Sequence, residues 1–285
     1  MIDSSLFNIH GKLIRIDYPA IMGIINLSQN SFYSESILSS PTEIVNKAQK
    51  HLEEGAQIID LGAASTRPGS KIVDPLLEQR LLIEAFDLIT PMKGKALISI
   101  DTMHSSTAQI MLERGAHLIN DVSCGEFDPN MIDVVADFNV PYIGMHMRGI
   151  PENMQSEEHL VYEDLVSEII QYFSRKKFEL LDKNVHQLIF DPGFGFSKNL
   201  NQNYELLSKL NLFQILECPI LVGLSRKSMI AKILGTNAEG SLHGTIAAQT
   251  IALMQSACIL RVHDVAPAKD LIRVFQEFKR EDAKF

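Results

Sequence analysis

Charged and polar side chains follow nearly every short apolar run of this chain, and they fall into two chemical groups. The first group could hydrogen-bond the polar edge of a flat heterocycle, and it consists of Asp101, Asn120, Asp191 and Lys227. Burying such groups without partners is costly, so a ligand or another member of the group must satisfy them. We therefore expect a ring-binding site at these four residues.

The second group is suited to anions. Arginine presents a planar fork that matches phosphate oxygens, and the chain places Arg67 and Arg261 after separate apolar runs. His263, Thr66 and Asn26 add further polar contacts. Together these residues predict a polyphosphate site, with a hard divalent cation to which one or two protein oxygens contribute.

Some of these residues also fit a simpler role, because aspartate, asparagine and serine are common as turn residues and helix caps after a strand. Asp121 and Asp264 each lie one residue beyond a polar neighbour and suit that role. Turn chemistry does not require two arginines, a lysine and a histidine at similar positions. The set as a whole therefore favours a binding site.

The apolar runs predict eight strands that are apolar along nearly their whole length. Such strands are buried on both faces, which is typical of a parallel sheet covered by helices. Between these strands, apolar residues recur at the spacing of a helix. Examples are Thr42–Gly55 and Ser105–Gly115, each with a glycine at its expected end. The expected strands are Ile21–Asn26, Gln57–Leu61, Leu97–Asp101, His117–Asp121, Tyr142–His146, Leu188–Asp191, Ile220–Gly223 and Cys258–His263.

Alternating strands and helices in this number predict an α/β fold, a (β/α)8 TIM barrel with its polar strand ends at one face. A doubly wound open sheet is the competing fold, but it would need fewer strands and usually a glycine-rich first turn. Leu6–Asp17, centred on Gly11, predicts a β-hairpin. We expect residues 1–18 to cap the N-terminal mouth of a single barrel domain that spans residues 1–285.

The overall composition narrows the partners and the location. The chain has 285 residues, is 46% hydrophobic and carries a net charge of -9, which argues against nucleic-acid and anionic-membrane binding. Three well-separated cysteines suit free thiols, and neither a signal peptide nor a membrane-spanning run stands out. These features predict a cytoplasmic protein.

Eight segments resemble those of the bacterial dihydropteroate synthases, in the same order along the chain. They begin near Met22 and continue almost to the last expected helix, and such an ordered set is far more specific than any one segment. The segments are MGIINLSQNSF (Met22–Phe32), IIDLGAASTRPG (Ile58–Gly69), ISIDT (Ile98–Thr102), LINDVS (Leu118–Ser123), MHMRG (Met145–Gly149), FDPGFGFSKN (Phe190–Asn199), VGLSRKS (Val222–Ser228) and LRVHDV (Leu260–Val265).

The resemblance implies a transferase of folate biosynthesis, usually a homodimer, on a (β/α)8 barrel. The family condenses 7,8-dihydropterin-6-ylmethyl diphosphate with 4-aminobenzoate and releases 7,8-dihydropteroate and diphosphate, with Mg2+ assisting. Sulfonamides resemble 4-aminobenzoate and compete for its pocket. We expect a dissociative (SN1-like) mechanism, in which diphosphate leaves first and the arylamine attacks a cation delocalised over the pterin.

Matching motifs imply roles for individual residues of the pterin site. The ring would be bound by Asp101, Asn120, Asp191 and Lys227. It would be flanked by Met145 and Phe196, for which plain core packing is the alternative.

The remaining roles concern the leaving group and the second substrate. Arg261 would lie near the pterin with its charge toward the diphosphate. The diphosphate or its metal would be contacted by Asn26, Thr66, Arg67 and His263, with Asn26 as the metal ligand. The 4-aminobenzoate pocket would be lined by Phe32, Pro68 and Ser228. The catalytic residues are expected to be Asp101, Lys227, Arg261 and His263.

The first loop departs from the family pattern. Where the family commonly has a proline, two aspartates and a glycine pair, this chain has Gln29, Asn30, Ser34, Glu35 and Ser36. Loss of two glycines lowers the backbone freedom of a loop that closes over the site in the family. We therefore predict an active enzyme with altered loop dynamics.

Three other functions compete with this interpretation. Corrinoid-dependent methyltransferases share the aspartate and asparagine strand ends, but they lack the Ser225–Ser228 and Arg261–His263 segments that suggest diphosphate binding here. Lys227 could instead form a Schiff base in an aldolase, with Arg226 lowering its pKa. A pterin-binding protein without activity is the third alternative.

Overall fold

The computed structural model describes residues 2–27, 40–63, 69–92 and 94–282. The unusual first loop lies outside these residues, as do Phe32, Thr66, Arg67 and Pro68. None of the helices in the described ranges is both long enough and apolar enough to cross a bilayer.

Eight parallel strands build the main sheet, and all eight strand predictions are confirmed. The strands are β3 (Ala20–Asn26), β4 (Ile58–Gly62), β5 (Leu97–Asp101), β6 (Leu118–Asp121), β7 (Tyr142–Met145), β8 (Leu188–Asp191), β9 (Leu221–Val222) and β10 (Ile259–Val262). They are hydrogen-bonded in the order β8-β7-β6-β5-β4-β3-β10-β9. A parallel bridge between Phe190 and Ile220 joins β8 to the residue before β9 and closes the sheet into a barrel.

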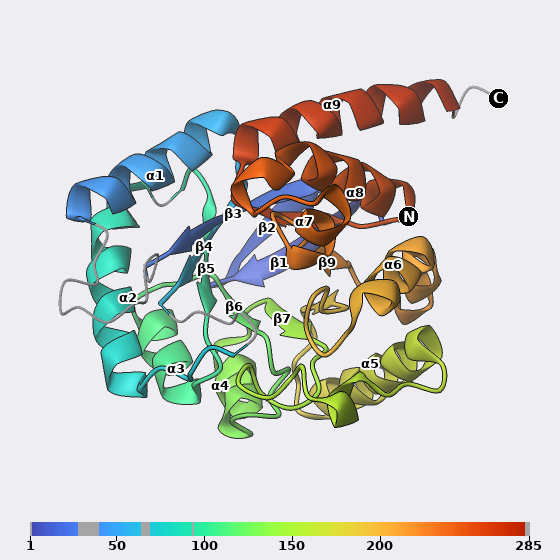
Figure 1. The fold of residues 1–285 in the computed structure, drawn as a ribbon. Coiled ribbons are helices and arrows are strands. Elements are labelled where there is room, and N and C mark those ends of the chain that lie inside the picture. The colour runs from blue at the N-terminus through green and yellow to red at the C-terminus, as the bar shows by residue number, and fades with distance from the viewer. Residues whose placement is uncertain (1, 28–39, 64–68, 93, 283–285) are drawn as a thin grey trace.

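Helices surround this barrel, as Figure 1 shows for α1 to α9. Their apolar faces and the outward faces of the strands form one large buried cluster, so the main core lies between the two layers. The helices are α1 (Pro41–Glu54), α2 (Pro75–Ile89), α3 (Ser105–Glu113), α4 (Asn130–Phe138), α5 (Leu165–Asp182), α6 (Leu200–Ser208), α7 (Ser228–Leu234), α8 (Leu242–Met254) and α9 (Val265–Asp282).

Local sequence signals explain where the two helices predicted from their spacing begin and end. Helix α1 begins after Ser40, whose side chain forms a capping box with Glu43, and it stops at a left-handed Gly55, as predicted. Helix α3 ends two residues earlier than predicted, at Glu113. Arg114 follows as its C-cap, and the left-handed Gly115 comes after it.

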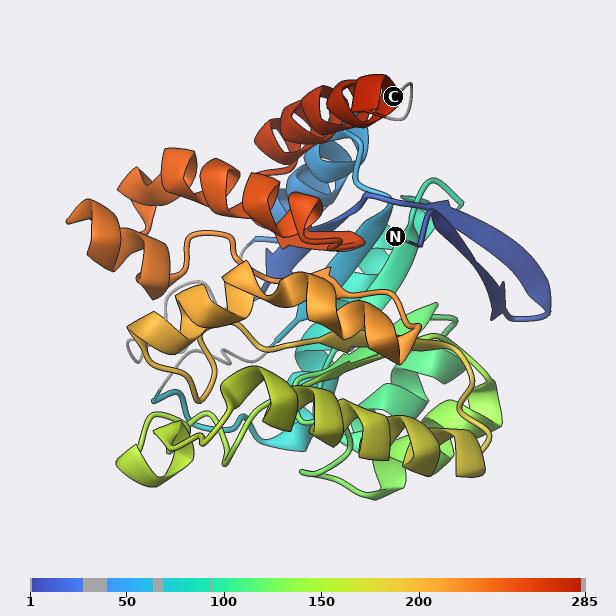
Figure 2. The ribbon, with the colours of Figure 1, turned by 90° about the vertical axis from the view of Figure 1, so that its right-hand side faces the viewer.

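The predicted N-terminal hairpin is confirmed as β1 (Ser4–Ile9) paired with β2 (Lys12–Asp17). Its turn residues His10 and Gly11 both have positive φ, which two-residue hairpin turns require. Figure 2 shows the dark-blue hairpin projecting from one end of the barrel. A second buried cluster packs the hairpin against the strand beginnings, through Phe7, Ile9, Ile16, Met22, Ile58, Leu97, Leu118, Ile143, Ile189, Leu221 and Ile259.

Gln187 ties the hairpin to the barrel. Its amide oxygen accepts from the Asn8 N–H at 2.6 Å, and its Nε2 donates to the carbonyls of Asn8 and Asn139 at 3.0 and 2.6 Å. Replacing Gln187 with leucine leaves these backbone groups without partners, so we expect the free energy of unfolding to fall by about 1–3 kcal/mol. Urea denaturation would measure the change.

The matched control is Gln214→Leu, because Gln214 is exposed and its Nε2 donates to the carbonyl of Asn211, three residues earlier. We expect that control to change the free energy of unfolding by less than about 0.5 kcal/mol. Equal effects of the two substitutions would show that Gln187 does not anchor the hairpin.

Candidate active site

Strand register brings the predicted site residues to one end of the barrel. Asn26 pairs with Gly62, Gly62 with Asp101, and Asp101 with Asn120, so these four residues form one rung across four neighbouring strands. Met145 at the end of β7 pairs with Asp191 at the end of β8. The expected convergence of strand ends is therefore confirmed for these residues.

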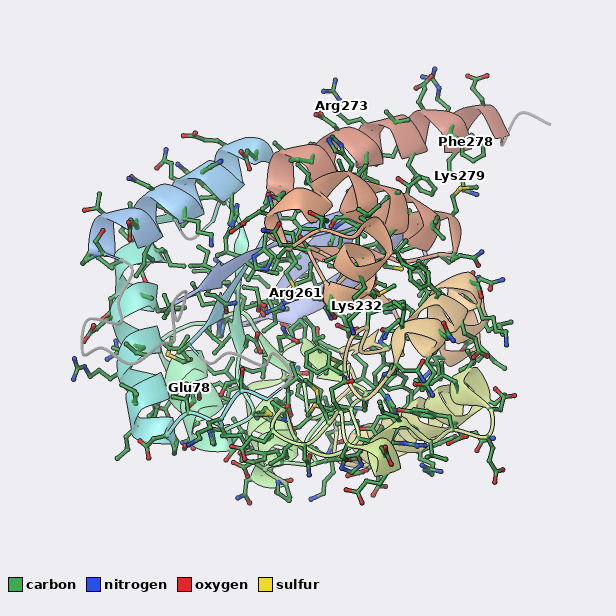
Figure 3. The ribbon with its side chains drawn as sticks, viewed as in Figure 1. Glu78, Lys232, Arg261, Arg273, Phe278 and Lys279 are labelled. Carbon is green, nitrogen blue, oxygen red and sulfur yellow. The ribbon has the colours of Figure 1, made fainter. Side chains whose placement is uncertain are left out.

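Arg261 on β10 connects three polar residues near the middle of this end. Its Nε donates to Asp60 Oδ2 at 2.7 Å, and its Nη2 donates to Asp101 Oδ2 at 2.5 Å. Asn120 Nδ2 donates to the same Asp60 oxygen at 3.2 Å. Figure 3 shows Arg261 within the ring of strands. Arg261 therefore forms ion pairs with both Asp60 and Asp101, while Asp60 Oδ1 is buried with no hydrogen-bond partner among the described residues.

Burial controls the charge of this group. Asp60 is 0% exposed and Asp101 is 5% exposed. Burial raises the pKa of Asp101 to about 7, although Arg261 opposes the shift. Burial alone would lower the pKa of Arg261, but the neighbouring carboxylates of Asp60 and Asp101 raise it above its ordinary value. The guanidinium therefore stays charged across the physiological range.

Asp191 and Lys227 form a second polar pair on the other side of the mouth. Asp191 Oδ1 accepts from the Gly193 N–H at 2.8 Å, and Lys227 Nζ donates to the Phe194 carbonyl. Burial raises the pKa of Asp191, and burial lowers the pKa of Lys227 to about 8. The charge of Arg261 acts on both groups, so acids and cations share one rim in the described part of the site.

An apolar wall lies beside these polar groups. Met145 and Phe196 both belong to it, and the Lys227 ammonium lies 4.7 Å from the centre of the Phe196 ring. The wall combines Met103, Val122, Met145, Met147 and Met154 with the partly buried Ile72, Phe127 and Phe196. Such a wall suits a flat ring, while its side chains also pack against one another.

The remaining predicted residues lie around the same mouth or outside the described ranges. Asn26 is half-buried at the end of β3, and Ser228 is exposed at the start of α7. His263 is half-buried just after β10, and its backbone N–H donates to Ser225 Oγ at 3.2 Å. Four predicted contacts fall among the undescribed residues, namely Phe32, Thr66, Arg67 and Pro68.

The simpler role is confirmed for Asp121. Its carboxylate accepts from the backbone N–H groups of Ser123 and Gly125 at 2.8 and 2.7 Å, which builds the turn after β6. Asp264 instead binds Arg226 through two hydrogen bonds of 2.8 and 2.9 Å.

The proposed effect of Arg226 on Lys227 is wrong. The pKa of Lys227 is lowered by burial and by Arg261, while the Arg226 guanidinium turns to Asp264.

Three buried residues with polar contacts were not assigned roles from the sequence. Asp60 was expected only as part of the strand Gln57–Leu61, although it binds Arg261. Glu78 of α2 accepts from Thr102 Oγ1 at 2.7 Å, directly behind Asp101. Lys198 is 2% exposed and contacts His146, the residue that follows β7. The position of Lys198 within FDPGFGFSKN was the one signal that pointed to it.

Comparison with known proteins identifies relatives of this chain. The pterin binding enzyme family matches residues 22–263. The dihydropteroate synthase of Escherichia coli is 36% identical over 268 residues, which covers 93% of this chain and 94% of that protein. The bifunctional dihydropteroate synthase/dihydropteroate reductase of Helicobacter pylori is 39% identical over 276 residues, 96% of this chain and 71% of that protein.

Solved structures show the same fold. A Yersinia pestis dihydropteroate synthase in complex with a sulfonamide drug superposes with a TM-score of 0.89 at 32% identity, covering 97% of this chain and 100% of that one. A Xanthomonas albilineans dihydropteroate synthase with 4-aminobenzoic acid gives a TM-score of 0.86 at 32% identity, with 97% and 98% covered. The chain therefore belongs to the pterin-binding enzyme family and, within it, to the dihydropteroate synthases.

Proposed function

We propose that this chain condenses 7,8-dihydropterin-6-ylmethyl diphosphate with 4-aminobenzoate to form 7,8-dihydropteroate and diphosphate. The observation that carries the proposal is the shared rim, on which Asp101 and Asp191 lie within the electrostatic reach of Arg261. Carboxylates can accept from the N–H groups of a pterin, and a fixed guanidinium can stabilise the charge that develops on a departing diphosphate.

The individual residues divide the reaction between them. Asp101 and Asp191 accept from the pterin edge, and Asn120 and Lys227 donate to it. As the carbon–oxygen bond breaks, the two carboxylates stabilise the cationic pterin methylene, while Arg261 and His263 stabilise the leaving diphosphate. The arylamine nitrogen attacks without prior deprotonation, and the ammonium formed with the new carbon–nitrogen bond then releases one proton to solvent, so no strong base is needed. Ser228 lies beside Lys227 and suits a contact with the carboxylate of 4-aminobenzoate.

The proposal includes Mg2+ held by Asn26 and the substrate diphosphate. The described residues hold no group of three or more histidine, cysteine, aspartate and glutamate side chains arranged for a metal. Magnesium often uses only one or two protein oxygens together with substrate phosphates. The Asn26 amide oxygen at the end of β3 fits that mode. When bound, the ion would neutralise negative charge on the leaving group.

Calorimetry followed by an activity assay tests this function. We expect binding of pterin diphosphate in the presence of Mg2+, then binding of 4-aminobenzoate, and release of one diphosphate for each dihydropteroate formed. Binding without turnover would instead indicate a pterin-binding protein without activity. Binding of methyltetrahydrofolate but not of pterin diphosphate would favour a methyltransferase.

The affinity for pterin diphosphate should depend on pH on both sides of neutrality. The acid Asp101 has a pKa raised to about 7 by burial, so affinity should rise as pH increases through that value and the carboxylate forms. The base Lys227 has a pKa lowered to about 8 by burial, so affinity should fall above that value as its donor charge is lost. Calorimetry across this pH range measures both the rise and the fall in affinity. In Asp101→Asn the rise in affinity with pH should shrink to the part that Asp191 contributes, because burial also raises the pKa of Asp191, while the fall at high pH should stay.

We also propose that the chain forms a homodimer through α7, α8 and α9, which lie side by side in Figure 1. Six large apolar side chains on these helices are between 45% and 72% exposed, namely Ile233, Leu234, Ile251, Met254, Val274 and Phe278. Single exposed apolar residues are ordinary, but a group of this size on adjoining helices suits an interface. The proposed location is the cytoplasm, supported by three free cysteines.

A charge placed in this face tests the dimer. Val274→Asp should weaken self-association at least about tenfold because an unpaired charge would be buried in the contact. Sedimentation velocity over a range of protein concentrations measures this. Phe178→Asp is the matched control, since Phe178 is 76% exposed on α5, a helix that Figure 1 shows away from α7, α8 and α9. If both variants self-associate as tightly as the wild type does, this interface is excluded.

A further inference from the structure

The loop between β8 and α6 supplies two groups that hold Lys227. The carbonyl of Phe194 accepts from the Lys227 ammonium, and the ring of Phe196 lies 4.7 Å from the same nitrogen. The same loop begins at Asp191, whose carboxylate accepts from Gly193. The placement of the proposed pterin donor Lys227 therefore depends on how firmly this loop is held.

Lys198 belongs to the same loop, and it is almost fully buried, with 2% of its surface exposed. Its ammonium has three donors, and three acceptors surround it, although burial lowers the pKa of Lys198 well below its ordinary value. Nζ lies 3.0 Å from the carbonyl oxygen of Gly193, 3.0 Å from that of Phe196 and 3.1 Å from His146 Nδ1. Lysine is seldom buried to this extent, so this set of contacts calls for an explanation.

The fixed end of this arrangement is His146. Its ring is buried and packs edge-on against Tyr172, with the ring centres 5.0 Å apart. Burial, followed by the charge of Lys198, lowers the pKa of His146 well below its ordinary value. The imidazole is therefore neutral, and we assign it the tautomer in which Nδ1 accepts from Lys198 Nζ.

The backbone also presses the loop against β7. A Cβ atom added at Gly193 would lie 2.1 Å from the His146 carbonyl oxygen, and Gly193 has a φ of +77°. Only glycine fits this position. Further along the loop, the Gly195 N–H donates to Asn203 Oδ1 at 2.6 Å. Strand β7 and helix α6 thus hold the loop from both sides.

We infer that Lys198 is a positioning residue for the pterin site. Its ammonium fixes the loop after β8 to His146, and the loop in turn places Lys227 and Phe196 where they meet the ring. The inference rests on the proposed function, because it assigns Lys227 to the pterin. It adds a role for a lysine that acts through the loop backbone and not on the substrate itself.

The test compares Lys198→Met with Lys177→Met in the full chain. Methionine keeps a long unbranched side chain and removes all three donors. Lys177 is the matched control, since its Nζ also donates to a backbone carbonyl, that of Leu216 at 2.7 Å, near the start of β9 and away from the site. Calorimetry with pterin diphosphate and Mg2+ gives the Kd. Steady-state kinetics give kcat and a Michaelis constant for each substrate.

Lys198→Met should raise both the Kd and the Michaelis constant for pterin diphosphate at least tenfold. At saturating pterin diphosphate, kcat and the Michaelis constant for the arylamine substrate should change less than threefold. Lys177→Met should match the wild type within twofold on every measure. A folded Lys198→Met protein with wild-type pterin affinity would overturn this inference and leave the proposed function standing. Failure of the wild type to bind pterin diphosphate would overturn the proposed function and, with it, the inference.

Hydrogen exchange on the wild type decides the matter if Lys198→Met does not fold. A loop fixed in advance should protect the Phe196 N–H, which donates to the Gly193 carbonyl at 3.1 Å, before any ligand is added. Pterin binding should then slow its exchange less than threefold. Exchange at the rate of an unstructured peptide in the free protein, with protection only after pterin binding, would refute a preformed loop.

Discussion

Asp191→Asn is expected to weaken the binding of pterin diphosphate by at least about hundredfold, with little loss of stability. An uncharged amide keeps an acceptor for the Gly193 N–H but loses the negative charge that would bind the pterin N–H groups. Truncating one side of a buried charged hydrogen bond commonly costs about 2–5 kcal/mol of binding. Calorimetry with pterin diphosphate and Mg2+ measures the loss.

Stability separates this effect from unfolding. Burial raises the pKa of Asp191, which means that the folded protein tolerates its negative charge poorly. Removing the charge should therefore leave the free energy of unfolding within about 1 kcal/mol of the wild type near pH 8. Asp133→Asn is the control, because Asp133 pairs with Lys183 on the surface. Equal pterin affinity in both variants would remove Asp191 from the site.

Arg261→Met should produce the largest loss of stability among single substitutions at the site. It leaves Asp60 and Asp101 facing each other without a cation, both nearly inaccessible to water. Breaking a buried ion pair in this way typically costs about 3–5 kcal/mol. Urea denaturation near pH 8 measures this loss, and pterin binding should be lost as well.

The loss should shrink as the pH falls. Without the guanidinium, the pKa of Asp101 rises above its value of about 7, so the folded variant takes up a proton at a higher pH than the wild type does, and the loss shrinks as the pH falls toward about 7. Arg114→Met is the control, since Arg114 pairs with Asp87 at the surface and such pairs contribute about 0–1 kcal/mol. A loss that is independent of pH would contradict the role assigned to these carboxylates.

The fold could be predicted because its signals are local. A run such as Leu97–Asp101 is apolar until its last residue, apart from Ser99, and a buried strand in a barrel needs that pattern. Strand β9 is shorter than predicted, since Gly223 leaves the ladder and Ile220 forms only a bridge. Hydrophobicity alone does not show whether a buried residue forms the backbone hydrogen bonds of a strand or lies just beyond them.

The site could be predicted only in part, because some of its contacts depend on closure of the barrel. Asp60 and Arg261 are 201 positions apart in the chain, and no spacing rule connects them. Lys198 is harder still, since lysine is ordinarily a surface residue and its neighbours in the sequence do not indicate burial. The hypothesis of altered loop dynamics concerns residues 28–39, which lie outside the described ranges, and it stays a prediction.

The single bridge between Phe190 and Ile220 gives the barrel a seam where few backbone hydrogen bonds hold neighbouring strands together. The chain crosses that seam through α6 and the short helix Leu210–Leu216. A circular permutant with new ends in the exposed part of this short helix would interrupt no ladder between neighbouring strands. The chain of this enzyme can therefore be opened in this helix, with its original ends joined, while both sides of the pterin site stay intact.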